Sequence, residues 1–233
     1  MNYYNDNKIQ YVLSFPELDY IDLNILFKEE LNRKIKISSD IAIISTITTY
    51  NSFFLNQCKN NNIEIIQTKQ SNIYEAIKRI EKKYVLIIKD KDALIVNDIE
   101  NDFLKEFNSL NMPFLFAGME FPLPSNDLEG YRNTFIKGKY KNVNGMLMFG
   151  KTSDILKFYE SIIDNERIED SFIEEQIKIR KSLINYRKDF ISYIDSQANL
   201  FSTITKINTI IKEKDNNRYI VNHNFLGIYD YIF

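Results

Sequence analysis

The sequence has little of several residue types: one cysteine, one histidine, four prolines, six glycines and no tryptophan among 233 residues. The single cysteine, Cys58, excludes an internal disulfide framework and a zinc site made of several cysteines, and it favours a reducing compartment, the cytoplasm. With 30 basic and 32 acidic residues the formal net charge is -2, so the chain has no basic excess for binding nucleic acid. Long apolar runs and the pattern of a signal peptide are also absent, so we expect no membrane span.

What the sequence does have is an alternation of apolar segments of strand length with amphipathic segments of helix length, in a chain that is 44% hydrophobic. This alternation predicts an α/β fold with a doubly wound sheet flanked by helices. The expected strands are residues 40–49, 63–67, 84–88, 93–96, 114–117 and 143–149. The expected helices are residues 50–58, a segment capped by Ser71, and segments that begin at Asp102 and at Ser153.

The chain is interpreted as one domain without internal repeats. Residues 1–38 carry no chemical motif and are interpreted as an amino-terminal appendage of the same domain, with residues 39–233 as its body. Residues 118–139 are predicted to form a long loop over the sheet edge. Because ligands of doubly wound sheets bind beyond the carboxyl ends of the strands, we expect site residues directly after strands.

Asp90 and Asp92 are the most informative pair, because they lie between two apolar runs at the carboxyl end of a predicted buried strand. Two carboxylates this close repel each other unless a cation joins them, and hard divalent ions take carboxylate, phosphate and water oxygens as ligands. The pair therefore predicts a site for Mn²⁺ or Mg²⁺. The alternative from the residues alone is a solvated turn in which Lys89 and Lys91 neutralise both acids.

Polar residues near the carboxyl terminus are further candidates. His223 ends an apolar run, and its neutral imidazole could add a nitrogen ligand to the metal, although an ordinary packed or surface histidine is the alternative. Asn224 could bind a phosphate or a sugar hydroxyl. Glu174, Glu175 and Gln176 lie in a helix-like stretch, where they could orient sugar hydroxyls or act at a reacting centre, or could form a solvated face.

Asn142, Asn144 and Gly145 lead into another apolar run. A glycine at this point would let the backbone approach a ligand closely. A plain turn explains the same residues equally well.

Taken in order, these segments resemble the metal-dependent glycosyltransferases of the GT-A fold. The resemblance is closest to the glycosyltransferase domain of the procollagen lysyl hydroxylases and to its bacterial and viral relatives. It rests on the order and spacing of motifs between residues 40 and 233. The segments that carry it are Ile41–Thr48, Tyr84–Val96, Phe116–Glu120, Asn142–Gly150, Glu174–Gln176, Asp195 with Leu200 and Phe201, and His223–Asn224.

The resemblance implies a GT-A fold, a Rossmann-like nucleotide-diphospho-sugar transferase domain with a mixed sheet flanked by helices. It implies transfer of a hexose from a UDP-sugar to a hydroxyl of a protein, glycan or lipid-linked acceptor. The donors it favours are UDP-glucose and UDP-galactose, and it implies that the configuration at the anomeric carbon is retained. It assigns Asp90, Asp92 and His223 to the metal, and Glu174 and Glu175 to the reacting centre. The residues that it assigns to the nucleotide-sugar are Thr46, Thr48, Asp90, Asn142, Asn144, Gly145, Gln176 and Asn224.

The chain also departs from the lysyl hydroxylase pattern. One residue, rather than two, separates its acidic pair, which is the spacing more usual in GT-A enzymes generally. Glu174 and Glu175 stand where the family has aspartates, and asparagines rather than glycines flank His223.

Two other interpretations stay open. A haloacid-dehalogenase-like phosphatase also has a strand followed by Asp-x-Asp, but with Thr or Val where this chain has Leu94. A non-catalytic nucleotide-sugar-binding or scaffold protein would keep the fold and lack the chemistry.

Overall fold

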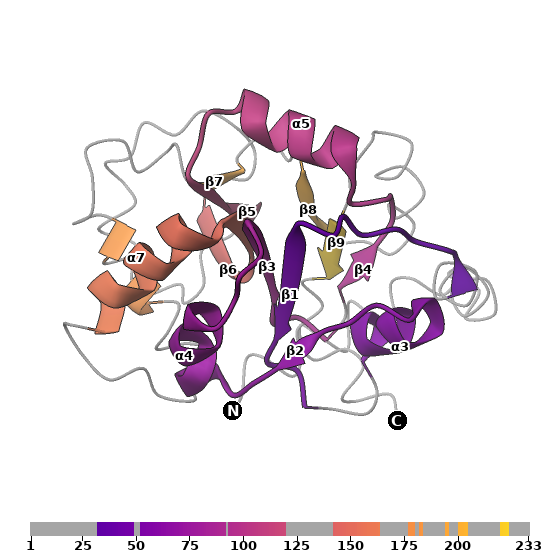
Figure 1. Ribbon diagram of the computed structural model, residues 1–233, viewed down its shortest axis with the longest axis horizontal. Coiled ribbons are helices and arrows are strands. Elements are labelled where there is room, and N and C mark those ends of the chain that lie inside the picture. The colour runs from indigo at the N-terminus through magenta and orange to yellow at the C-terminus, as the bar shows by residue number, and fades with distance from the viewer. Residues whose placement is uncertain are drawn as a thin grey trace, which may run out of the picture.

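The computed structural model describes residues 32–48, 52–91, 93–119, 142–163, 177–179, 182–183, 194–195, 200–204 and 220–223. These residues form a mixed α/β fold in which two sheets pack with helices around two apolar cores (Figure 1). The expected α/β class is therefore confirmed. Residues 1–31, most of the expected appendage, lie outside the described residues.

The larger sheet consists, within the described residues, of six strands: β1 Ile41–Ser45, β2 Ile66–Gln67, β3 Tyr84–Ile88, β5 Phe114–Met119, β6 Asn142–Lys151 and β7 Ile194–Asp195. Their order is β2-β1-β3-β6-β5-β7. β1 is parallel to β2 and β3, β6 is antiparallel to β3 and β5, and β7 is parallel to β5. β1 and β3 are buried along their whole length, as expected for continuous apolar runs in the middle of a sheet.

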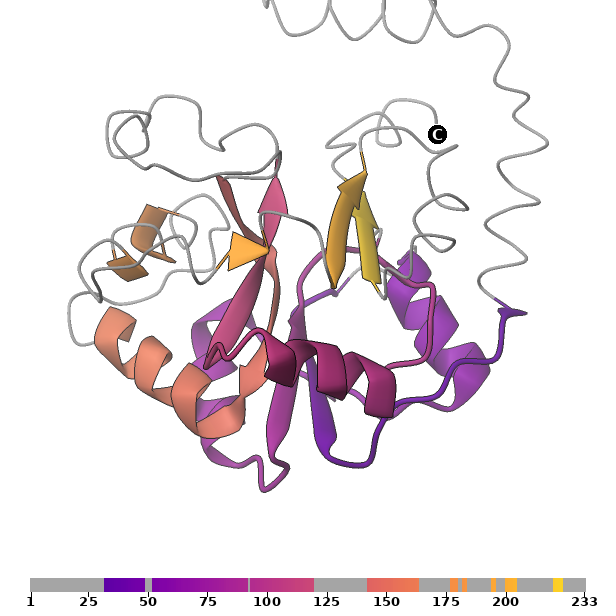
Figure 2. The same cartoon turned by 90° about the horizontal axis from the view of Figure 1, so that it is seen from above.

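A smaller sheet lies beside the larger one. In the described part of the chain it has the strands β4 (Leu94–Ile95), β8 (Phe201–Ile204) and β9 (Ile220–His223), in the order β4-β9-β8. β9 pairs antiparallel with β4 and parallel with β8. Figure 2 shows β8 and β9, in gold and yellow, beside the strands of the larger sheet.

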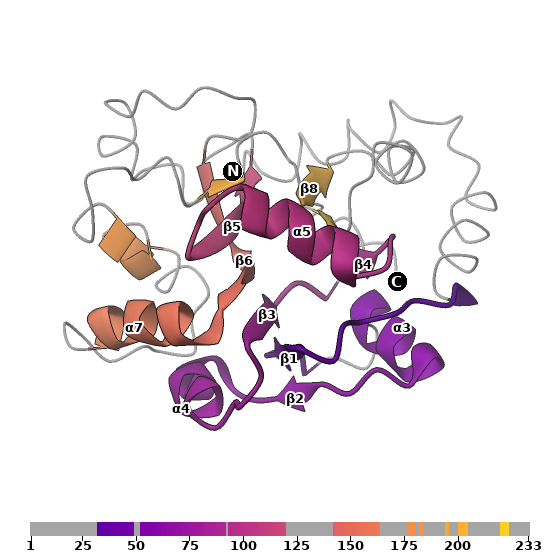
Figure 3. The same cartoon turned by 45° about the horizontal axis from the view of Figure 1, so that its top comes forward.

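Helices and the smaller sheet cover the two faces of the larger sheet (Figure 3). α4 and α7 pack on one face, and α3, α5 and the smaller sheet pack on the other. None of the described helices is long and apolar enough to cross a lipid bilayer. The helices are α3 Phe53–Asn61, α4 Ile73–Lys78, α5 Asn101–Ser109 and α7 Thr152–Ile163, and the 3₁₀ turn η1 is Gln70–Asn72.

Local sequence signals explain where these helices begin and which side they bury. The Ser52 hydroxyl accepts a hydrogen bond of 3.1 Å from the Leu55 amide and so caps α3, and Asn62, with φ of 54°, ends it. The helix expected from Ser153 is confirmed as α7, and the four apolar residues that helical spacing places on one side of it are all buried. They are Ile155, Phe158, Tyr159 and Ile162.

Three local predictions were wrong. Ser71 does not cap α4, because it lies inside η1 and Asn72 occupies the N-cap position. The strand expected at residues 63–67 pairs with β1 through Ile66 and Gln67, while Ile63 and Ile65 pack against the core as part of the preceding connection. The loop expected from residue 118 begins later, because β5 continues to Met119; residues 120–139 lie outside the described residues.

The single cysteine lies on the buried side of α3. The Cys58 side chain is 1% exposed, and burial raises the pKa of its thiol to about 12. The thiol is therefore protonated at neutral pH, as is typical of a buried structural cysteine.

Candidate functional site

Eight buried polar or charged residues occur in the described part of the chain: two belong to α3, and six lie at the carboxyl ends of β1, β3 and β7 or at the start of β6. β6 runs in the opposite direction, so its first residues lie at the same edge. A buried polar group is unfavourable unless it has partners, so a concentration of such groups at one edge indicates a functional site. The eight are Ser45, Ser52, Gln57, Lys89, Asp90, Asn142, Asn144 and Asp195.

The segment that follows β3 carries two of these charges. We call residues 89–93 the acidic loop. The Lys89 amide continues the ladder with a bond of 2.9 Å to the Met146 carbonyl, and the Asp90 carbonyl accepts 3.2 Å from the Ala93 amide. Lys89 and Asp90 are 9% and 8% exposed, and the Lys89 Nζ lies 3.4 Å from the Tyr159 hydroxyl on α7. The loop thus leaves β3 in a tight turn with a carboxylate held at the sheet edge.

An irregularity in β6 places a second polar group beside this loop. Phe116 of β5 pairs with Met148, but the next residue, Ala117, pairs with Asn144, so residues 145–147 of β6 form a bulge. The Asn144 Oδ1 accepts a hydrogen bond of 3.1 Å from the Met146 amide across the bulge. Gly145 lies inside it and is buried. The bulge therefore changes the direction of β6 near its start, at the edge where ligands of such sheets bind.

Asn144 and Asp195 flank the small side chain of Ala117. Ala117 pairs with Asn144 on one side and with Asp195 of β7 on the other, so the three residues form one row on one face of the sheet. The Asp195 Oδ2 accepts hydrogen bonds of 2.7 Å and 2.8 Å from the Leu200 and Phe201 amides. Asp195 thereby joins the larger sheet to the start of β8.

A cleft of about 550 Å³ opens beyond the carboxyl ends of β1 and β2. Two hydrogen bonds connect the segments that follow β1 and β2 here. The Gln67 Nε2 donates to the Ile47 carbonyl at 3.0 Å, and the Thr68 amide donates to the Ser45 carbonyl at 3.0 Å. Its volume is that of a small-molecule site, and two lysines make it favourable for an anion. The lining residues are Ile47, Thr48, Leu55, Asn56, Lys59, Gln67, Thr68 and Lys69.

The backbone of β9 brings His223 toward the acidic loop. Leu94 pairs with Val221 and Ile95 with Ile220 in the antiparallel register. His223 lies two residues after Val221. Because the strands are antiparallel, it lies toward the start of β4, which is the end that follows the acidic loop. On its other side His223 pairs with Ile204 of β8. The smaller sheet therefore carries the single histidine to the same region as Asp90.

The structure brings part of the predicted site together. Asp90, Asn142, Asn144, Gly145 and the backbone of His223 lie at the carboxyl edge, Thr46 follows β1, and Thr48 lines the cleft. The remaining predicted residues lie outside the described residues. They are Asp92, Glu174, Glu175, Gln176 and Asn224.

The described side chains alone do not complete a metal site. Among them no group of three or more His, Cys, Asp or Glu residues is arranged to hold a metal ion. The Asp92 and His223 side chains, two of the three predicted ligands, are not part of that set. Asp90 is thus the one predicted ligand whose side chain the structure describes.

Ser52 and Gln57 belong to the site region although the sequence analysis did not name them. Both are fully buried on α3 and both bond to the backbone of the acidic loop or of β4. The signal for Ser52 was available, because a serine before an apolar helical stretch is a typical N-cap. Gln57 gave no signal, because a glutamine on a helix is exposed in most proteins.

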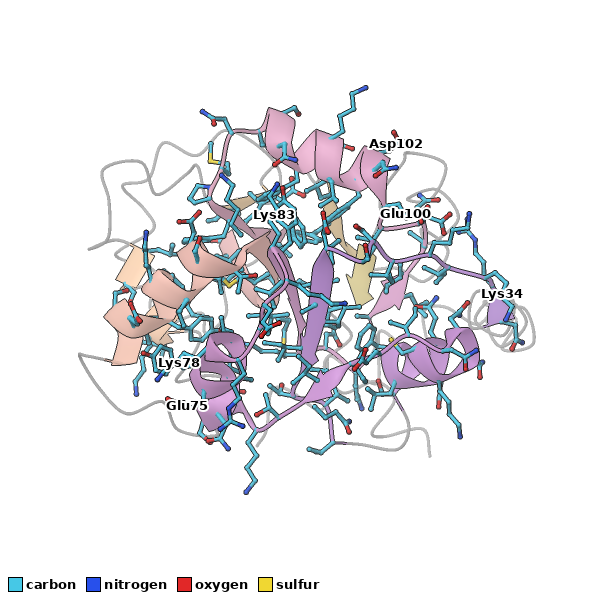
Figure 4. The ribbon with its side chains drawn as sticks, viewed as in Figure 1. Lys34, Glu75, Lys78, Lys83, Glu100 and Asp102 are labelled. Carbon is cyan, nitrogen blue, oxygen red and sulfur yellow. The ribbon has the colours of Figure 1, made fainter. Side chains whose placement is uncertain are left out.

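The charged side chains labelled in Figure 4 lie at the outside of the described fold. Glu75 and Lys78 of α4 form an ion pair of 3.5 Å and are about half exposed, and Glu100 and Asp102 lie at the start of α5. Such exposed pairs contribute little to stability. Lys89 and Asp90 differ from these residues because their charged side chains are buried.

Comparison with known proteins identifies no family or curated relative whose site residues could be compared with these. No protein-family model matches the chain, and no curated protein matches it significantly. The site is a polar carboxyl edge on a mixed α/β sheet.

Proposed function

We propose that this chain is a metal-dependent glycosyltransferase of the GT-A type, which moves a hexose from a UDP-sugar to a hydroxyl acceptor. The observation that carries the proposal is the gathering of buried polar residues at the carboxyl edge, where α3 both bonds to the acidic loop through Ser52 and lines a cleft for a small ligand. A mixed sheet with a smaller sheet beside it is compatible with that fold.

Asp90, Asp92 and His223 would hold Mn²⁺ or Mg²⁺. The chemistry of the donors fits, because carboxylate oxygens and one imidazole nitrogen suit Mn²⁺. The register of β4 and β9 supports the set: Leu94 pairs with Val221 in the antiparallel direction, so the strand that carries His223 runs toward the end of the acidic loop. When bound, the ion would stabilise the negative charge that develops on the diphosphate leaving group.

The cleft is suited to the nucleotide. Thr46 and Thr48 follow β1, and the amide of Asn56 and the cations Lys59 and Lys69 supply hydrogen bonds and positive charge in or beside the cleft. These groups would bind the base, ribose and phosphates while the acidic loop holds the other end of the diphosphate.

The donor hexose would lie against the start of β6. Asn142 and Asn144 offer amide groups for its hydroxyls, and Gly145 in the bulge permits close approach of the backbone. Glu174, Glu175 and Gln176 are proposed to complete this part of the site by orienting the sugar and stabilising positive charge at the anomeric carbon.

A turnover assay tests this proposal. Purified chain is incubated with a panel of UDP-hexoses and Mn²⁺, and the release of UDP is measured with wild type, with Asp92→Ala and with the control Asp102→Ala on α5. We expect UDP release with wild type and control, and at least about 100-fold less with Asp92→Ala, because a lost ligand weakens metal binding more than a lost outer partner does. Full metal-dependent release by Asp92→Ala would sink the proposal, and UDP binding without any release would favour the non-catalytic alternative.

A further inference from the structure

Helix α3 holds the acidic loop through its N-cap residue. The Ser52 hydroxyl donates a hydrogen bond of 2.9 Å to the Lys91 carbonyl while it accepts the Leu55 amide. The Phe54 amide donates to the same carbonyl at 3.4 Å. The carbonyl between the two acidic residues is therefore fixed by the first turn of α3, where the backbone amides have no intrahelical acceptor.

A second residue of α3 holds the strand that follows the loop. The Gln57 Nε2 donates 2.9 Å to the Ile95 carbonyl, and the Gln57 Oε1 accepts 2.9 Å from the Ile95 amide. The side-chain amide thus pairs with β4 as a neighbouring strand would, on the edge of β4 that faces away from β9. Gln57 is fully buried, so both bonds are shielded from water.

From this geometry we infer that Ser52 and Gln57 are positioning residues for the metal site, an inference that rests on the proposed function. They fix the backbone at two points, Lys91 in the acidic loop and Ile95 in β4, which lie before and after Asp92 and Ala93 in the sequence. Ile95 also pairs with Ile220. By fixing Ile95, Gln57 therefore also fixes the position of β9, the strand that carries His223. Partners that orient ligands in this way change metal affinity about 10- to 100-fold when they are lost.

The same helix supplies a matched control. Asn61 also makes two hydrogen bonds from its side chain to backbone, one accepted from the Ile35 amide and one donated to the Gln57 carbonyl, each 2.9 Å. Neither bond touches the acidic loop or β4. Asn61→Leu therefore removes a similar interaction from the same helix without disturbing the metal ligands.

The test measures Mn²⁺ affinity in the presence of UDP, together with the urea midpoint of unfolding, for wild type and for Ser52→Ala, Gln57→Leu and Asn61→Leu. We expect the first two variants to bind Mn²⁺ about 10- to 100-fold more weakly, and Asn61→Leu to bind within about twofold of wild type. All three should unfold at lower urea than wild type. Ser52→Ala and Gln57→Leu serve as independent variants in case one of them does not fold.

Two results would overturn the inference. Wild-type Mn²⁺ affinity in both Ser52→Ala and Gln57→Leu, or an equal loss of affinity in Asn61→Leu, would show that these side chains of α3 affect stability alone. Either result would leave the proposed function intact. A wild-type chain that binds no Mn²⁺ with UDP would overturn the proposed function and this inference together.

Discussion

Asp90→Asn is expected to weaken Mn²⁺-dependent binding of UDP by at least about 100-fold while the chain stays folded. The substitution keeps the size and shape of the side chain and removes its negative charge, which is what a hard divalent cation requires of this ligand. The fold should tolerate it, because the Asp90 carbonyl that closes the turn to Ala93 is unchanged. A neutral amide is also easier to bury than a carboxylate in a position that is 8% exposed.

Calorimetric titration with UDP in the presence of Mn²⁺ measures this effect, and Asp102→Asn provides the control. Asp102 lies at the exposed start of α5 and carries the same charge, so its replacement changes the net charge by the same amount. Undiminished UDP affinity in Asp90→Asn would remove Asp90 from the metal site. An equal loss in Asp102→Asn would mean that the net charge of the chain, rather than a ligand, controls binding.

Gly150→Ala is expected to lower the free energy of unfolding by about 3 kcal/mol or more, because the new methyl group has no room. A Cβ at this position would lie 2.4 Å from the Phe114 Cβ and 2.7 Å from the Pro113 carbonyl oxygen. β6 cannot move aside, since Gly150 pairs with Phe114 on one side and with Val85 on the other. The clash is with the backbone of β5, which a rotamer change cannot relieve.

Urea denaturation of Gly150→Ala measures this loss, with Lys151→Ala as the control. Lys151 is the next residue of β6 and is exposed, so its truncation should change the free energy of unfolding by less than about 0.5 kcal/mol. A Gly150→Ala chain as stable as Lys151→Ala would mean that β5 and β6 separate more easily than their pairing indicates. Aromatic packing also holds β6 in place, because the Phe149 ring lies 4.7 Å from Phe103 and 4.8 Å from Phe107, both on α5.

The parts of the fold that follow from local pattern were predictable. β3 is a run of five apolar residues that stays buried from Tyr84 to Ile88, and its boundaries match the sequence pattern. α7 presents its apolar residues at helical spacing, so its buried face could be read from the sequence. The place of Asp90 followed from β3, because a polar residue directly after a central strand lies at the carboxyl edge.

Features that depend on contacts between distant segments were not predictable. Ile63 and Ile65 look like strand residues, but pairing with β1 begins at Ile66. The bulge at residues 145–147 arises from the register between β5 and β6, which no local pattern encodes. The pairing of β4 with β9 likewise joins segments far apart in the sequence, and it is this pairing that brings His223 toward the acidic loop.

The candidate site divides in the same way. Residue chemistry and spacing predicted the acidic pair, the asparagines of β6 and the histidine. The roles of Ser52 and Gln57 became visible when α3 was seen to bond to Lys91 and Ile95. Side chains that act on backbone leave no motif in the sequence, because any segment supplies the same amide and carbonyl groups.

The central claim is that this edge of the sheet binds a nucleoside diphosphate through a divalent cation, and a calorimetric titration with UDP tests it most directly. Wild type, Asp92→Ala and His223→Ala are each titrated with Mn²⁺ and again with excess EDTA. We expect binding by wild type in Mn²⁺, no binding in EDTA, and loss of binding in both variants. UDP binding that is equally strong in EDTA, or no binding in either condition, would contradict the claim.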